Sequence, residues 1–458
     1  MASISSLYTA LSGINAQRRV MDVTSHNIAN ETTAGHHRQR AELAPISGAP
    51  VSAVFAGQGA RPGGVQVTGV TSARDALLEA RAVREQAAQS STDLMATTLE
   101  RIEGLFGEPS DGGLASQLSE FWGGWVDLAD QPGGLATRTQ VLERASALTD
   151  ALQQTAAALN AVRASAVDRV ASLATDVNGL TSEIAALNAT IVANPGASND
   201  LLDRRDLLVT SLSERTGAVA RPSGNGQVDV YIGGRSVVSG TVAQLLDGTG
   251  GTLRWALDGQ VVSAPSGQAA ALAATITDIV PRYLAGLDDV ASTVVTQVNA
   301  LHSAGYDQAG TTGRMFFDPA GVTAATIALS TDVAGQPANV AAGAPVFPGP
   351  TAPGALDGEQ ARAIAALADS AAGADAKYGA LVSRLAVETR AAVRRADVQH
   401  QITDSAVSDA LQVTSVSLDE EMANLISAQR AYEASARVLT AVDELMDTLI
   451  NRTGVVGR

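Results

Sequence analysis

The chain of 458 residues contains no cysteine. Disulfide bonds, thiolate metal sites and cysteine nucleophiles are therefore excluded. Aromatic residues make up only 3% of the chain, although hydrophobic residues make up 45%. Much of the apolar content is therefore Ala, Val and Leu, which favours long, closely packed helices over a compact enzyme with a deep pocket.

Negatively charged residues outnumber positively charged ones, 47 to 31. Lys377 is the single lysine, and the formal net charge is −16. Surfaces that bind nucleic acid or anionic membranes need clustered cations, so we expect neither partner. No apolar run approaches the roughly 18–20 residues that span a bilayer, so we expect no membrane insertion. The first basic residue is Arg18, which predicts that a conventional cleavable secretory signal is absent.

The first thirty residues carry a helical pattern. Apolar residues recur at spacings of three, four or seven, as on one face of a helix: Ile4, Leu7, Leu11, Ile14, Met21 and Ile28. Gly13 weakens this helix, and the Asn- and Thr-rich stretch after Ile28 is expected to end it.

The last forty residues mirror this pattern. One row has a spacing of seven: Leu418, Leu425, Tyr432, Leu439 and Met446. Further apolar residues flank it: Met422, Ala428, Val442, Leu449 and Ile450. Ser417 and Glu420 before and within the first turn predict a capping box. The C-terminal segment is therefore predicted to be a helix.

Either terminal helix alone would be marginally stable in water, so each needs a partner surface. Two interpretations remain open from the residues alone. The helices could dock on the body of a monomer, or they could order fully only between subunits.

The middle of the chain predicts a rod of helices. A heptad pattern runs from Thr137 to Asn194 and stops at Pro195, which corresponds to a helix on the order of 80 Å long. Segments 267–304, 360–372 and 375–414 are candidates for the helices beside it. The tryptophans of "FWGGW" are expected to anchor helix packing.

Between the helical segments lie stretches whose residue patterns predict strands and turns. Segment 227–240 alternates around a Gly-Gly turn and predicts a hairpin, and 251–265 resembles a second one. Segment 306–358 is rich in Gly, Pro, Ala and Thr, with a possible strand at 325–329.

The predicted fold is therefore mainly α with a smaller β-rich portion, elongated and multi-domain. Three parts are expected: paired terminal helices forming a coiled coil (1–40 and 416–458), a helical rod (41–195, 266–305 and 359–415), and a β-rich outer region (196–265 and 306–358).

Motifs of catalysis are missing. The chain has no Walker loop, nucleophile elbow or HExxH sequence. The glycine-rich 57–64 stretch is interpreted as a loop, and "DQAGTTG" (307–313) as a turn. His36 and His37 are adjacent and would point apart on a strand, so no metal site is predicted. We expect no enzyme activity, catalytic residue, metal or cofactor.

The two ends carry a family resemblance. "LYTALSGINAQRRVMDVTSHNIANETTAGHHRQ" resembles the N-terminal signature of bacterial flagellar rod, hook and hook-associated proteins, and "LDEEMANLISAQRAYEASARVLTAVDELMDTLI" resembles their C-terminal signature. The middle is more specific. "LSEFWGGWVDLADQPGGLATRTQVLERASAL", "NDLLDRRDLLVTSLSE", "VNALHSAGYDQAGTTGRMFF" and "LDGEQARAIAALADS" resemble the hook-associated protein 1 family.

The resemblance implies that the terminal helices pair as the inner domain of an axial structure, with their apolar residues at the interface between subunits. Asn27 and Asn30 are expected to satisfy backbone groups where the first helix ends, and Gly35 to take a positive φ. An extended connection would then lead to the rod. The sequence departs from the family's usual turn, because Ala34 and His36 stand where the family has Pro and Tyr.

The resemblance also implies a function and partners. The expected protein is a non-enzymatic junction subunit between flagellar hook and filament, outside the cell after a cytoplasmic stage. Its expected partners are further copies of itself in a ring or helix, the hook protein, the second junction protein, and an export chaperone on the C-terminal helix. A hook or rod protein is the nearest alternative, and a secreted coiled-coil adhesin is a more distant one.

Overall fold

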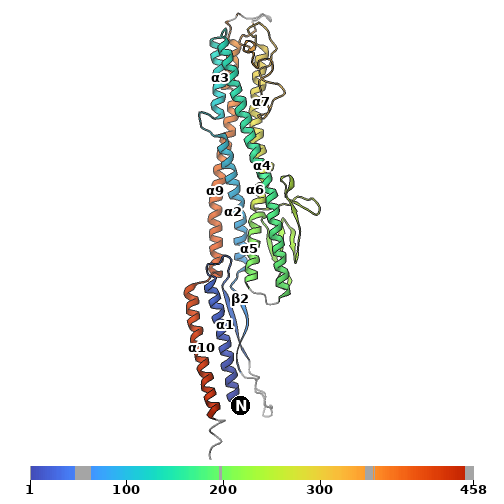
Figure 1. Ribbon diagram of the computed structural model, residues 1–458. Coiled ribbons are helices and arrows are strands. Elements are labelled where there is room, and N and C mark those ends of the chain that lie inside the picture. The colour runs from blue at the N-terminus through green and yellow to red at the C-terminus, as the bar shows by residue number, and fades with distance from the viewer. Residues whose placement is uncertain (1, 47–62, 195–198, 346–353, 355, 449–458) are drawn as a thin grey trace, which may run out of the picture.

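The computed structural model describes residues 2–46, 63–194, 199–345, 354 and 356–448, with the side chains of 2–5 excepted. It forms a long rod that tapers at one end (Figure 1). Helix α1 (Ala2–Ala29) and helix α10 (Leu418–Asp447) form the tapered end together. No helix among the described residues is long and apolar enough to cross a membrane.

The terminal helices pack antiparallel. Asn27 near the end of α1 contacts Glu421 near the start of α10. Further along, a Cβ added to Gly13 would lie 3.0 Å from the Ser435 hydroxyl. Gly13 weakens the helix in isolation, but in the pair its missing side chain lets the two backbones approach closely.

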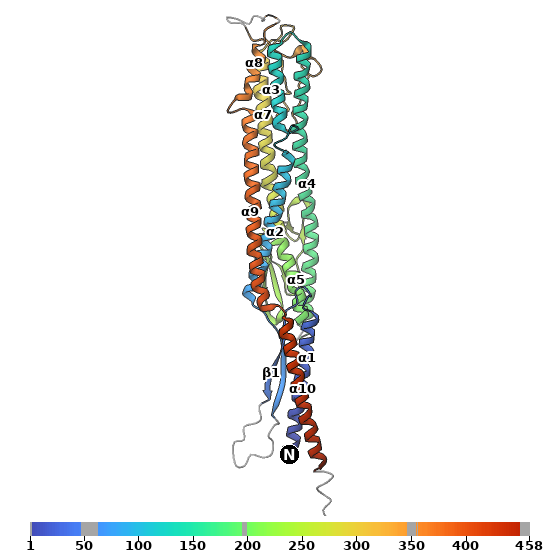
Figure 2. The same cartoon turned by 90° about the vertical axis from the view of Figure 1, so that its left-hand side faces the viewer.

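A β-hairpin lies beside this pair. Strands β1 (Gln39–Ile46) and β2 (Gly64–Ser72) are antiparallel, with a bulge between Glu42 and Leu43. The hairpin runs back along α1 (Figure 2), where the Ser12 hydroxyl accepts a 3.2 Å hydrogen bond from the Val65 N–H. The expected extended connection between α1 and the rod thus takes the form of two strands, the first of which runs back along the terminal helix.

The rod is built on long antiparallel helices. Helix α2 (Ala76–Phe106) lies against α9 (Ala374–Thr414), and helix α3 (Leu114–Asp130) lies against α4 (Leu135–Ala193). Helix α7 (Val280–Ala304) and helix α8 (Glu359–Ala365), which continues as the 3₁₀ turn η5 (Ala366–Asp369), complete the far end. The predicted 137–194, 267–304 and 375–414 helices are confirmed.

Two of the predicted helical features differ in the structure. The segment expected to be helical to residue 372 leaves helix after Asp369. Ser417 is the N-cap residue of α10, but its side chain makes no capping hydrogen bond. The capping box is therefore wrong, because the Glu420 carboxylate instead accepts a 2.7 Å hydrogen bond from Arg38.

The far end of the rod has an aromatic core. Phe121, Trp122 and Trp125 of α3 are buried, which confirms the packing role expected for the tryptophans. Trp125 lies 5.1 Å from Phe316, between ring centroids. Segment 306–345 covers this core with turns, the 3₁₀ turn η4 (Pro337–Asn339) and isolated bridges, and no named strand lies within it.

A small β-sheet packs on the flank of α4 (Figure 1). Its four antiparallel strands follow helix α5 (Asn199–Thr216) in the order β3–β4–β5–β6. They are β3 (Val219–Pro222), β4 (Val228–Ile232), β5 (Arg235–Ser239) and β6 (Val242–Ala243). The predicted hairpin around Gly233 and Gly234 is confirmed, and both glycines have positive φ.

The second predicted hairpin is different. Strand β8 (Arg254–Trp255) pairs with β7 (Leu246–Asp247), and only a single bridge joins Arg254 to Val261. The 3₁₀ turns η1 (Gly224–Gly226) and η2 (Thr249–Gly251) connect strands, and helix α6 (Gly267–Ala274) passes through the π-helical turn η3 (Thr275–Ile279) into α7.

Segments 196–265 and 306–358, which were expected in one β-rich region, pack in different places. The sheet belongs to a core with the C-terminal half of α4, whereas the described part of 306–358 belongs to the aromatic core at the far end. The three-part division of the chain stays a prediction.

Candidate functional site: the terminal helices and their joint with the rod

The buried apolar side chains of α1 and α10 are small. Ala10, Ala16 and Val23 are buried on α1, and Ala428 and Val442 on α10. Because these side chains are short, they bury little apolar area, and the larger apolar residues lie toward the edges of the pair.

The predicted interface residues divide by exposure. Exposed are Leu7, Leu11, Leu418, Met422 and Tyr432. Half-buried are Ile14, Ile28, Leu425, Leu439 and Met446. Val442 is buried in the intramolecular pair. The side chains of Ile4 and Leu449 lie outside the described residues.

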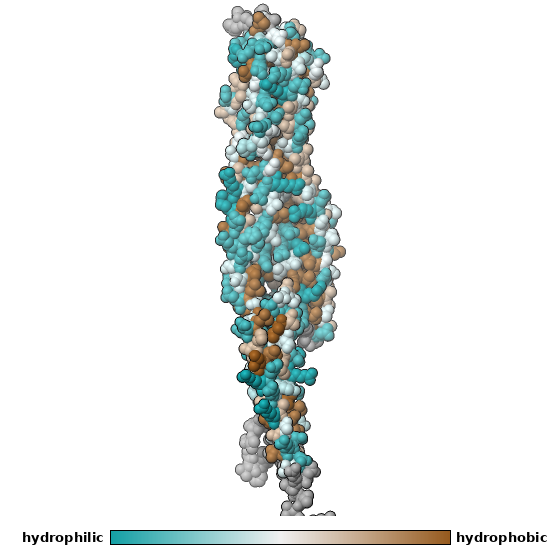
Figure 3. Space-filling model, turned by 60° about the vertical axis from the view of Figure 1, so that its left-hand side comes forward, coloured by the Kyte–Doolittle hydropathy of each residue, from teal (hydrophilic) through white to brown (hydrophobic). Residues whose placement is uncertain are grey.

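The outer faces of the pair therefore carry an apolar surface. Tyr8, Ile426, Val438 and Leu445 are also exposed there. Figure 3 shows hydrophobic side chains gathered on the tapered part of the molecule below the rod. We call the exposed apolar residues of α1 and α10 the terminal apolar surface. Exposed large apolar side chains on adjacent helices mark a surface that binds another protein.

Asn27 joins three segments at the top of this pair. Its amide nitrogen donates hydrogen bonds to the Gln39 carbonyl at 2.8 Å and to Glu421 Oε2 at 3.0 Å. Its amide oxygen accepts the Gln39 N–H at 2.9 Å. Asn27 therefore satisfies backbone groups of the strand after the helix rather than of the helix end itself.

Asn30 and Gly35 shape the turn after α1. Asn30 Nδ2 donates to the His26 carbonyl at 3.0 Å, which caps the last turn of the helix. Gly35 has a φ of 74°, the positive value predicted for it. A side chain at this position would also overlap Leu207 of α5, so glycine is needed both for conformation and for space.

Arg38 fixes the start of α10. Its guanidinium donates to Glu421 Oε1 at 2.8 Å and to Glu420, and its backbone N–H donates to the Thr414 carbonyl at 2.8 Å. The chain segments that leave α1 and enter α10 are thus held together at the narrow point between tapered end and rod.

A second charged group links this point to the rod. Arg74 donates to Asp203 Oδ1 at 2.6 Å and also to Asp206, both on α5. His37 shares Asp203, with 2.7 Å between Nδ1 and Oδ1 and a 3.1 Å hydrogen bond from its backbone N–H. The side chains of Arg74 and His37 therefore both contact the buried carboxylate of Asp203.

These contacts set the local charge states. Burial alone would raise the pKa of Asp203, but the hydrogen bonds from His37 and the Arg74 charge outweigh it and lower the pKa. Burial likewise opposes the positive charge of Arg74, but the neighbouring Asp206 raises its pKa above the ordinary value. Burial raises the pKa of the nearby Glu79 carboxyl. An ionised Asp203 therefore anchors the joint.

The structure corrects the expectation for the two adjacent histidines. Residues 36–38 are not in a strand, so the two side chains do not point apart. His36 Nδ1 lies 3.8 Å from Asp203 Oδ2, and the His36 ring lies 5.4 Å from the ring of His26. Three of the chain's five histidines lie close together here. The sequence alone does not predict this cluster, because it depends on the turn after α1.

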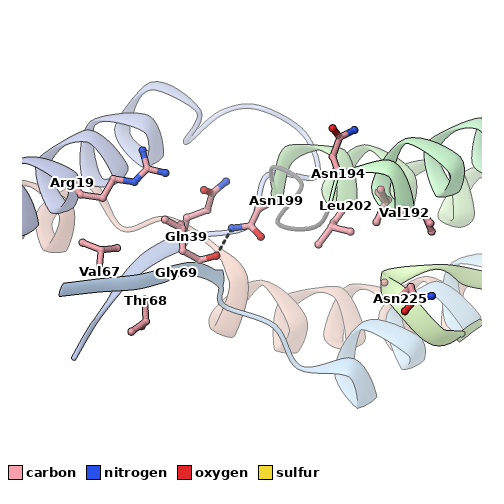
Figure 4. A pocket seen from close by; sticks show the side chains of 13 residues that line it. Arg19, Gln39, Val67, Thr68, Gly69, Val192, Asn194, Asn199, Leu202 and Asn225 are labelled. Carbon is pink, nitrogen blue, oxygen red and sulfur yellow. Dashed lines mark hydrogen bonds between the residues drawn. The ribbon is translucent and has the colours of Figure 1, made fainter. Parts of the chain in front are cut away.

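A cavity of about 990 Å³ adjoins the joint between α1, β2, α4 and α5 (Figure 4). Arg19 contributes its one charged lining side chain among the described residues, and Gln39, Asn194 and Asn199 contribute amides. Asn199 Nδ2 donates to the Val70 carbonyl at 3.2 Å. The cavity is an amide-lined cleft between tapered end and rod rather than a cluster of acid and base groups.

Comparisons with known proteins match this architecture. The family model of the flagellar hook-associated protein FlgK helical domain matches residues 99–317. Models of the flagella basal body rod protein and of the flagellar basal body rod FlgEFG protein C-terminal region match residues 7–36 and 407–452. The flagellar hook-associated protein 1 of Bacillus subtilis is 28% identical over 99% of each chain. Along 99% of its length the chain is therefore similar to flagellar hook-associated protein 1.

More distant relatives agree with this assignment. Flagellar hook-associated protein 1 of Escherichia coli is 25% identical over 52% of this chain and 43% of its own length. The solved flagellar hook junction protein FlgK of Burkholderia pseudomallei covers 74% of this chain and 100% of its own, with a TM-score of 0.64 and 16% identity. That likeness shows a shared fold. The family models and the curated relatives together indicate a structural protein of the bacterial flagellum.

Proposed function

We propose that this hook-associated protein is a junction subunit that joins the flagellar hook to the filament through its terminal helices. The observation that carries the proposal is the terminal apolar surface, which stays exposed although α1 and α10 are already paired. In a ring or helix of subunits, this surface would be buried against the terminal helices of neighbouring copies. The half-buried Leu425 and Leu439 would complete their burial there.

The partners follow from this arrangement. One end of the ring or helix of subunits contacts the hook protein, and the other end contacts the second junction protein. Before export, an amphipathic helix with exposed Leu418, Met422 and Tyr432 needs cover, which a chaperone groove in the cytoplasm would supply. The mature location is the flagellum outside the cell. No enzymatic reaction is part of this function.

Variants of the terminal apolar surface test the proposal. Met422→Asp together with Leu445→Asp places two carboxylates on this surface without touching the buried side of the pair. We expect secreted subunits, an unchanged melting temperature of the rod, and cells whose hooks carry no filament. Leu425→Asp and Leu439→Asp should have the same effect.

Val398→Asp is the matched control, because Val398 of α9 and Met422 are both 55% exposed. Its filaments should be normal. Normal filaments in the Met422/Leu445 variant would contradict the proposal.

Deletion of the gene separates the junction role from the alternatives. Loss of the junction subunit should leave hooks of normal length and release filament protein into the medium. A hook or rod protein would be indicated by cells without hooks. An adhesin would be indicated by normal filaments together with reduced adherence. Electron micrographs of the deletion strain therefore distinguish all three.

A further inference from the structure

The joint between tapered end and rod contains a group of side chains that the junction function does not use. His26 lies in the last turn of α1, His36 in the following turn, and Asp200 in the first turn of α5. One ligand atom from each lies within 4.8 Å of the others. His26 Nε2 and Asp200 Oδ1 are already 3.1 Å apart.

His36 supplies the second, independent observation. Its side chain is only 5% exposed. Its Nε2 atom has no hydrogen-bond partner among the described residues. Burying an imidazole nitrogen costs free energy when no hydrogen bond or ligand replaces the water that it loses. A ligand on this nitrogen would supply the missing interaction.

We propose that His26, His36 and Asp200 form a binding site for a divalent transition-metal ion of the Zn²⁺ class. Two imidazoles and one carboxylate are the donor set that such ions take, with water in the fourth position. Zn–N and Zn–O bonds of about 2.0–2.2 Å put tetrahedral ligands roughly 3.4 Å apart. The histidine–aspartate pair is already close to this spacing at 3.1 Å, and the other ligand distances, all within 4.8 Å, would have to shorten by about 1 Å when an ion binds.

The surroundings orient these ligands. Gln39 Nε2 donates to Asp200 Oδ1 at 2.9 Å, and the Asp203 carboxylate faces His36 Nδ1 at 3.8 Å. At this distance Asp203 places a negative charge behind the His36 imidazole rather than a hydrogen bond on it. Burial lowers the pKa of His36.

The site would connect two parts of the molecule. His26 and His36 belong to the terminal segment, whereas Asp200 belongs to the rod. A bound ion would therefore hold the tapered end in one orientation relative to the rod. The proposal is independent of the junction function, since a metal could bind whether or not the terminal apolar surface assembles.

Titration of the untagged full-length chain with ZnCl₂ tests the site. We expect one tightly bound equivalent. His36→Gln, His26→Gln and Asp200→Asn should each weaken binding at least as much as the roughly 10–100-fold that loss of an outer-shell partner costs. His400→Gln is the matched control, because His400 also faces a carboxylate, Asp93, at 2.9 Å. It should bind Zn²⁺ like the parent chain.

A measurement on the unaltered protein guards against misfolded variants. X-ray absorption of the chain loaded with one equivalent of Zn²⁺ should show two imidazole ligands, and amides in residues 24–40 should exchange more slowly than without metal. Absence of tight binding, fewer than two imidazoles, or equal affinity in His36→Gln would overturn the proposal.

Discussion

The Asn27 amide donates a 3.0 Å hydrogen bond to the Glu421 carboxylate across 394 residues of sequence. Both residues are almost fully buried, at 0% and 2% exposed. Because Asn27 also pairs with both backbone groups of Gln39, this one side chain connects α1, β1 and α10. It is a buried polar contact at the end of the helix pair that lies next to the rod.

Asn27→Ala should therefore destabilise the terminal helices selectively. It leaves the Gln39 backbone groups and part of the Glu421 carboxylate without partners, which costs about 2–4 kcal/mol. The measurement is amide exchange in α1 and α10 under mild denaturant. Asn30→Ala removes fewer buried contacts and should cost about 1 kcal/mol. Equal losses in the two variants would contradict this role of Asn27.

Amide exchange on the unassembled chain should separate the two parts of the molecule. We expect faster exchange in α1 and α10 than in α2 and α9, because the terminal pair has small buried side chains and an exposed apolar surface. Assembly would then complete their burial. If the terminal pair is protected as strongly as α9, the helices are already fully stable in the monomer and assembly does not order them.

His302 should make the far end of the rod sensitive to acid. Burial lowers its pKa from 6.5 to about 4, and the neutral ring donates from Nδ1 to the Arg314 carbonyl and accepts the Ala341 N–H. The unfolded chain binds a proton first as pH falls. Stability is therefore fully present above pH 6.5 and declines toward pH 4, by up to about 3 kcal/mol.

Denaturant unfolding at pH 7 and pH 5 measures this effect. His302→Gln keeps one donor and one acceptor but does not titrate, so it should lose less stability than the parent chain between the two pH values. The same loss in both proteins would assign the acid sensitivity to other groups.

Two glycines near α4 should respond oppositely to alanine. A Cβ on Gly248 would lie 2.8 Å from Ala171 Cα and would also overlap the Val170 carbonyl, so Gly248→Ala should cost about 1–3 kcal/mol by pushing the segment between β7 and η2 away from α4. Gly179 lies exposed within α4, and nothing lies within 4 Å of its added Cβ. Gly179→Ala should stabilise by about 0.5–1 kcal/mol. Thermal melting of the two variants checks both signs.

The long helices could be predicted from sequence because their signal is periodic. Helix α4 keeps apolar residues on one face over its whole length and ends next to Pro195, so its bounds were off by two residues or fewer. Segment 306–345 could not be assigned in this way. Its backbone is held by single side chains, such as Asn299, whose Oδ1 accepts the N–H groups of Phe316 and Phe317. Such contacts produce no periodic pattern in the sequence.

The joint was harder to predict than the helices. Asn27 and Gly35 were identified by residue type, but Glu421 was not, because no local pattern pairs residues 394 positions apart. The interpretation of His36 and His37 assumed a strand, whereas Gly35 turns the chain so that both reach Asp203. The directions of the His36 and His37 side chains depend on the φ angle of Gly35, which cannot be predicted from the spacing of apolar residues.

The antiparallel pairing of α2 with α9 also favours one order in which the parts of the chain fold. Closing a loop of about 400 residues in an unfolded chain has a large entropic cost. Once the rod has formed, Arg38 and Thr414 are neighbours, and the loop that remains to be closed is effectively short. We therefore expect the terminal pair to form after the rod, since α1 can meet α10 most readily once the rod has brought the two ends of the chain together.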